Sequence, residues 1–136
     1  MSLKNYVVEG CSFEVYENGI VNTSGTVSVV SAASTNTKID GKGVYTTLLV
    51  AVEGFTSSDS SHQPWISGSG ATVTPAQILA SAQKNKVDNL SVVLEGDEAQ
   101  DVTIVGQKQQ GQTTVPEETT VTIKVKSAGQ SFVKGD

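Results

Sequence analysis

The chain has 136 residues, of which 37% are apolar, 5% aromatic and 17% charged, with a formal net charge of −5. One domain of this length buries roughly 68% of the surface of its unfolded chain, so folding requires neither disulfides nor a metal. All nine basic residues are Lys, and the lack of Arg together with the negative charge argues against a nucleic-acid partner.

Targeting and redox signals are sparse. The only cysteine, Cys11, excludes an intramolecular disulfide. The chain has no apolar run of 18 residues, and Met1 to Asn5 leads directly into a strand-like segment and not into a signal peptide. We therefore expect synthesis in the cytoplasm.

Strand signals occupy most of the first half. Short β-type runs cover Tyr6 to Val8 and Phe13 to Tyr16, and the turn residues Glu17 to Gly19 follow them. Thr or Ser alternates with Val from Thr26 to Ser31, and Val44 to Glu53 is long enough for an extended strand with one buried face. This half is typical of hairpins.

The middle of the chain is less regular. The segment from Gly54 to Gly70 is rich in Ser, Asp and Gly and predicts a loop. The one helix candidate is Thr74 to Gln83, where Thr74 can cap and Pro75 suits the first helical position. Helix and extended chain stay open as alternatives there.

The second half returns to strand patterns. Strands are predicted over Val87 to Glu95, Val102 to Val105, Thr119 to Lys126 and Ser131 to Lys134. Thr119 to Lys126 has the cleanest alternation, with its Val and Ile residues on one face. Residues 106–118 indicate an exposed loop or the arm of a long hairpin.

A short pattern occurs twice in the chain. Lys-x-Asp, a turn and an apolar run appear first at Lys38, Ile39 and Asp40 and again, 48 positions later, at Lys86, Val87 and Asp88. Chance similarity between two ordinary hairpins is the alternative, but a duplication predicts equivalent hairpins with Ile39 and Val87 buried and both Asp residues at turns. The expected fold class is therefore all-β: a compact prism or cone of stacked hairpins with an internal duplication and at most one short helix.

The residues capable of catalysis form no recognisable set. His62 is the only imidazole, and no nucleophile-elbow sequence surrounds any serine, so we expect His62 in an exposed loop and Cys11 as a small buried residue. The acidic run from Glu95 to Asp101 favours a solvated turn over a cation site. Trp65 is more typical of a core plug than of a sugar-stacking platform. No enzyme activity and no cofactor are expected.

Several short segments, taken in order, resemble a known family. They are Val8-Glu9-Gly10-Cys11-Ser12-Phe13, then Ser34 to Thr46 with Val52-Glu53-Gly54, then Gly70 to Thr74, Lys86-Val87-Asp88 and Val93 to Asp97, with a weaker echo in Ser127-Ala128-Gly129-Gln130. Their order resembles the PAAR and PAAR-like proteins that cap the spike of contractile injection machines, such as phage tails and type VI secretion systems. The resemblance covers about the first hundred residues, and no single segment is specific.

The resemblance implies a structural cap at the tip of a trimeric β-helical spike, one copy per virion or injection particle. Such a cap sharpens the spike for membrane penetration and contacts the target membrane only transiently. It implies three similar faces, two from the repeated hairpins and the third from Thr119 to Lys126. Residues 1–136 would form one domain, with 106–136 as a C-terminal strand extension.

The same resemblance raises the question of a metal. Family members with a structural metal at the tip place several His and Cys residues there. This chain offers only His62 and Cys11, which are weak candidates, so we expect no metal.

A β-sandwich module of a fibre, a capsid decoration or an adhesion protein is the alternative function. Seven or more short strands with Ser, Thr and Gly turns fit it as well. Such a module would self-associate or bind glycans through Trp65, whereas a spike cap would be a monomer.

Overall fold

The structure, a computed structural model, describes residues 3–58 and 64–136. All regular elements in these two ranges are β-strands, which confirms the all-β fold class. No helix long and apolar enough to cross a bilayer occurs among the described residues.

Fourteen strands make up the described chain. In order they are β1 (Lys4–Asn5), β2 (Ser12–Glu17), β3 (Ile20–Val21), β4 (Thr26–Val29), β5 (Lys38–Ile39), β6 (Lys42–Gly43), β7 (Leu48–Glu53), β8 (Ala71–Thr72), β9 (Ala76–Ile78), β10 (Lys86–Val87), β11 (Leu90–Ser91), β12 (Glu98–Gln110), β13 (Thr113–Ser127) and β14 (Lys134–Gly135).

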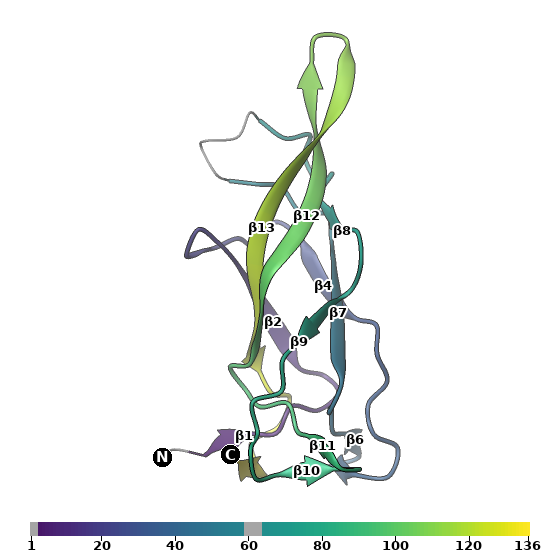
Figure 1. Cartoon of the computed structure of the whole chain (residues 1–136), viewed down its shortest axis with the longest axis vertical. Coiled ribbons are helices and arrows are strands. Elements are labelled where there is room, and N and C mark those ends of the chain that lie inside the picture. The colour runs from purple at the N-terminus through teal and green to yellow at the C-terminus, as the bar shows by residue number, and fades with distance from the viewer. Residues whose placement is uncertain (1–2, 59–63) are drawn as a thin grey trace.

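The strands form two larger antiparallel sheets and three small ones. One larger sheet has the order β3-β2-β13-β12-β8 and the other β4-β7-β9, while β5 pairs β6, β10 pairs β11 and β1 pairs β14. The molecule is elongated, with the three small pairs and both termini at one end and the β12–β13 hairpin rising at the other (Figure 1). We call the first end the base and residues 106–118 the arm.

The main core lies between the two larger sheets, because both contribute side chains to one buried cluster. Along β7, Leu48, Val50 and Val52 are buried, and the intervening residues are less so. On β13 the buried set is Val121, Ile123 and Val125, as the alternation predicts. Each such side chain contributes roughly 1.5–3 kcal/mol through removal from water.

A second, smaller core lies among the segments of the base. It contains Val8, Val44, Ala82, Val92 and Leu94. The repeated hairpins pack against it through Ile39 and Val87, which are half-buried and not fully buried, because each lies on a two-residue strand open to solvent. Both Asp residues of the repeat adopt positive φ, 53° at Asp40 and 52° at Asp88, and so occupy turns as predicted.

The helix candidate of residues 74–83 forms no helix, and Ala76–Ile78 within it form the strand β9. Ala76 pairs with Val50 and Ile78 with Leu48, so β9 extends the sheet of β7. Ile78 is buried whereas Leu79 is 66% exposed. Burial thus alternates along the chain, because the tertiary pairing with β7 overrides the local helix signal.

Residues 106–136 are integral to the fold and not an appended extension. β13 is a central strand, paired with β12 on one side and with β2 on the other. β14 completes the base by pairing with β1. The arm forms the outer end of the β12–β13 hairpin, which is one of the two alternatives predicted from the sequence (Figure 1).

The carboxylate of Glu17 is buried and accepts hydrogen bonds from three other segments of the body. Glu17, at the end of β2, is 3% exposed. It accepts hydrogen bonds from Asn22 Nδ2 at 3.3 Å, Thr119 Oγ1 at 2.9 Å, Ser57 Oγ at 2.5 Å, and from the backbone N (2.9 Å) and Oγ (3.2 Å) of Ser58. Burial acts to raise the pKa of Glu17, but these donors outweigh burial and hold it below its usual value.

Replacement of Glu17 by Gln should lower the free energy of unfolding by about 2 kcal/mol at pH 7, because the charged acceptor of several hydrogen bonds is lost. A depressed carboxyl pKa contributes stability above the unfolded value of about 4.3, and this contribution disappears as the pH falls through the folded pKa. The difference between the wild type and Glu17→Gln should therefore shrink in acid. Denaturant melts at pH 7 and below pH 4 measure it.

The exposed Glu53, at the end of β7, provides the control for this measurement. Glu53→Gln should leave the melt at pH 7 within about 0.5 kcal/mol of the wild type. Equal melts for Glu17→Gln and Glu53→Gln would contradict the role assigned to Glu17.

Candidate functional site at the base

Three buried backbone segments meet at the centre of the base in a closed ring of hydrogen bonds. Val7 N donates to Val93 O at 2.9 Å, Val93 N to Tyr45 O at 3.0 Å, and Tyr45 N to Val7 O at 3.0 Å. Each segment gives one donor and one acceptor to its neighbours. The ring therefore has the connectivity of an approximate three-fold axis within a single chain.

Each ring segment follows one of the three small strand pairs in the same way. The residue that precedes Tyr45, Val93 or Val7 donates its N–H to a carbonyl oxygen, and that oxygen belongs to the residue that precedes β5, β10 or β14. These bonds join Val44 to Thr37 at 3.1 Å, Val92 to Asn85 at 3.2 Å and Tyr6 to Val133 at 3.1 Å. The three units thus share one local geometry.

The third unit is a further copy of the sequence repeat. Lys134-Gly135-Asp136 begins 48 positions after Lys86, the same spacing that separates Lys86 from Lys38. The three lysines occupy the same place in their pairs, opposite Gly43, Ser91 and Asn5. The duplication is therefore a triplication, and the expected third face, Thr119 to Lys126, lies in the body on β13 instead.

The lead-in to two units is held by the same side-chain contact. Ser34 Oγ accepts from the backbone N–H groups two and three residues further on, at 3.3 and 3.1 Å. Gln130 Oε1 does the same at 2.7 and 2.9 Å. The two positions are equivalent in the repeat, so a short hydroxyl and a longer amide perform one task.

Two of the ring segments also continue into the same turn. Cys11 N donates to Val8 O at 3.1 Å, and Asp97 N donates to Leu94 O at 3.0 Å. Both turns need a glycine at positive φ, 90° at Gly10 and 93° at Gly96.

The glutamates of these turns reach to the neighbouring units. Glu9 Oε1 accepts from Gly43 N at 2.7 Å, and Glu95 Oε2 accepts from Asn5 Nδ2 at 2.8 Å. The base is thus held together between units as well as within them.

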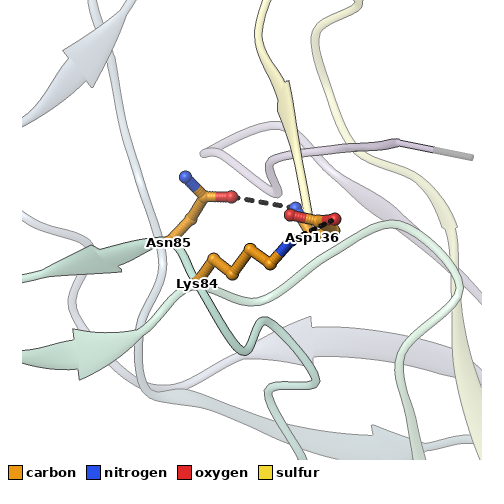
Figure 2. A network of polar contacts seen from close by, with 3 residues as sticks. All are labelled: Lys84, Asn85 and Asp136. Atoms are coloured by element: carbon orange, nitrogen blue, oxygen red, sulfur yellow. Dashed lines mark hydrogen bonds and ion pairs between the residues drawn. The ribbon is translucent and has the colours of Figure 1, made fainter. Parts of the chain in front are cut away.

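Polar contacts close the third unit, whose strands come from opposite ends of the described chain (Figure 2). Asp136 N donates to Asn85 Oδ1 at 2.8 Å, and Lys84 Nζ lies 3.9 Å from Asp136 Oδ2. The backbone of Lys84 also donates to Asp136 O at 2.9 Å. These contacts fix β14 against the segment that leads into β10.

The weak metal candidates do not form a site in the described structure. His62 lies outside the described residues. Cys11 is half-buried, and burial raises the pKa of its thiol to about 11, so the thiol stays protonated at neutral pH. Residues 3–58 and 64–136 contain no group of three His, Cys, Asp or Glu side chains arranged to hold a metal ion.

Two other sequence candidates have structural roles. In the acidic run, Asp97 is buried and accepts from Leu94 N at 2.8 Å and from Ser81 N at 2.9 Å, so it stabilises a turn. Trp65 is 7% exposed and packs edge-to-face on Phe55, with ring centroids 6.0 Å apart. It fills one end of the core, which leaves no open face for a sugar.

Of the ten exposed large apolar side chains among the described residues, four belong to the base and six lie elsewhere on the molecule. Phe132 is 75% exposed, Leu3 54%, Leu90 51% and Val133 38%. They lie on or beside β14, β1 and β11. The base therefore combines an approximate three-fold arrangement with uncovered apolar surface, and we take it as the candidate functional site.

The third unit should not accept the side chains that its counterparts carry. A Cβ at Gly135 would collide with Asn85 Oδ1 and Tyr6 Cε1, although the equivalent residues are Ile39 and Val87. We expect Gly135→Val to destabilise the protein by about 1–3 kcal/mol through overpacking. The matched change Ile39→Val should cost less than about 1 kcal/mol. Thermal melts that place Gly135→Val level with Ile39→Val would contradict the pairing of β1 with β14.

Comparison with known proteins leaves the family open: no protein-family model matches the chain, and neither the curated proteins nor the solved structures include a significant match.

Proposed function

We propose that this chain is a structural cap whose base sits on the end of a trimeric β-helical spike, one copy per spike, as in the PAAR-like proteins that its sequence resembles. The observation that carries the proposal is the approximate three-fold base within a single chain. No catalytic role is assigned to any residue.

The symmetry argument is geometric. Three identical chains that end together present three identical contact surfaces about one axis. A single chain can satisfy all three only if it offers three similar elements at matching positions. The units at Lys38, Lys86 and Lys134 surround one ring of hydrogen bonds and supply such elements.

The surface chemistry of the base supports a protein partner. Phe132 and Leu90 expose apolar surface at the base, and a protein partner seated there would remove this surface from water. A β-helix also ends in unpaired strand edges that attract unwanted pairing unless they are covered. A cap seated on that end would bury both surfaces.

The opposite end of the molecule fits a leading tip. The arm is a narrow two-stranded hairpin, and its end is exposed and polar, with Gln109, Gln110, Gln112, Thr113 and Thr114. The arm lies at the end opposite the base (Figure 1), so a cap docked through its base would point the arm away from the spike. Its contact with a target membrane would then be brief and mechanical.

The direct test is binding to the trimeric β-helical spike protein encoded in the same gene neighbourhood. Co-expression followed by native mass measurement should give three spike chains to one cap. Phe132→Asp should weaken the complex about ten-fold or more, because it places a charge in the apolar contact. Ile20→Asp is the control, since Ile20 is 69% exposed on β3, outside the base, and should bind as the wild type does.

Equimolar binding would contradict the proposal, and so would a Phe132→Asp variant that binds like Ile20→Asp. Failure to bind together with self-association into trimers would favour the alternative, a fibre, capsid-decoration or adhesion module. Light scattering of the chain alone distinguishes that outcome, because a cap should be a monomer.

A further inference from the structure

The lysines are unevenly distributed over the molecule. Six of the nine lie in the segments that build the base, namely Lys4, Lys38, Lys42, Lys84, Lys86 and Lys134. Three of these, Lys38, Lys86 and Lys134, occur at the same place in the three units and are all exposed.

We propose that these three lysines form a recognition ring, and that each receives one carboxylate from one chain of the three-fold partner. The inference rests on the proposed function and adds the chemistry of the partner. The partner is a trimer whose end presents an acidic side chain once per chain, at equal distances from its axis.

The ring lysines have no competing intramolecular role. Among the described residues, none of the three forms an ion pair or a side-chain hydrogen bond. Two neighbouring lysines differ in this respect. Lys42 Nζ donates to Gly129 O at 3.2 Å, and Lys84 pairs with Asp136 (Figure 2). Within the described part of the chain, the three repeat lysines are thus free of intramolecular partners, as is Lys4, which does not occupy the repeat position.

The sign of the charge varies within each unit. Asp40 and Asp88 follow two positions after their lysines and are exposed at the turns. The segments that build the base carry six of the fourteen acidic residues beside their six lysines, namely Glu9, Asp40, Asp88, Glu95, Asp97 and Asp136. Their charges therefore sum to zero, and the rest of the chain holds the net charge of −5. The net electrostatic attraction between the base and an acidic partner is therefore small.

A neutral surface with alternating charges distinguishes between orientations of a partner mainly through the positions of the individual charges. Opposite charges that meet in register attract, whereas a rotation about the axis brings Asp40 and Asp88 against the partner's carboxylates. The three equivalent lysines allow three equivalent orientations, and the exposed Asp40 and Asp88 penalise the orientations between them, whereas Asp136 pairs with Lys84. The three lysines thus set the rotational register of the cap on its partner, and the exposed apolar side chains of the base supply the remaining contact.

The test is charge reversal at one, two and all three ring positions. Lys38→Glu, Lys86→Glu and Lys134→Glu should each weaken binding to the trimeric spike by a similar factor, about 3–10-fold at low ionic strength. The triple variant should lose on the order of 100-fold, and the loss should shrink in 1 M salt. Lys126→Glu, exposed on β13 outside the base, is the matched control and should bind like the wild type.

The neutral triple variant, with Gln at all three positions, guards against misfolding of the charge-reversed protein. It should melt like the wild type and bind with a weaker salt dependence. The wild type could bind three spike chains while the triple variants match Lys126→Glu in affinity and salt dependence. That result would contradict the role of the three lysines and would still support the cap function. A wild type that binds no spike would overturn both.

Discussion

The three hydrogen bonds among Val7, Tyr45 and Val93 are the constraint on which the base depends. All three residues are buried, so a donor or acceptor left unpaired there would cost about 1–3 kcal/mol. Because each segment both gives and receives one bond, displacing any one of them orphans a group on each of the other two. The segments are consequently fixed relative to one another, and each carries its strand pair with it. Val7, Tyr45 and Val93 belong to the main core, and their chain neighbours Val8, Val44 and Val92 belong to the second core.

Local patterns in the sequence predict the parts of this fold that depend on local chemistry. The alternation of Thr119 to Lys126 identifies the buried face of β13, and the Asp-Gly and Asp-Asn pairs identify two base turns. Local patterns do not predict the long-range contacts. Glu17 meets Ser57 and Thr119, which lie 40 and 102 positions away, so no short motif marks the network. Local patterns do not predict the third unit either. Its two strands lie at opposite ends of the described chain, and Gly135 occupies the position of Ile39 and Val87 in the other copies.

The repeat is strict near the axis and relaxed away from it. At the base, the units share their strand pairing, their lysine and their link to the ring. Farther up, one unit extends into the 13- and 15-residue strands that form the arm, whereas another ends with the six-residue β7. A surface that must meet three identical chains keeps its units alike, and a surface that meets no symmetric partner has no such restriction. The distribution of similarity along the molecule is therefore what the proposed division between a docking end and a leading end requires.

The pairing of β1 with β14 has a consequence for biosynthesis. A third of the base cannot form until Lys134 and Gly135 have left the ribosome and reached Lys4 and Asn5, a closure over almost the whole described chain. Contacts of such sequence separation form late and slowly in folding. A nascent or truncated chain that lacks β14 would expose two units and an open ring, with Tyr6 N and Val133 O no longer joined. Only a chain synthesised through Gly135 can present the complete base, so attachment to a partner would have to wait until β14 has emerged and paired with β1.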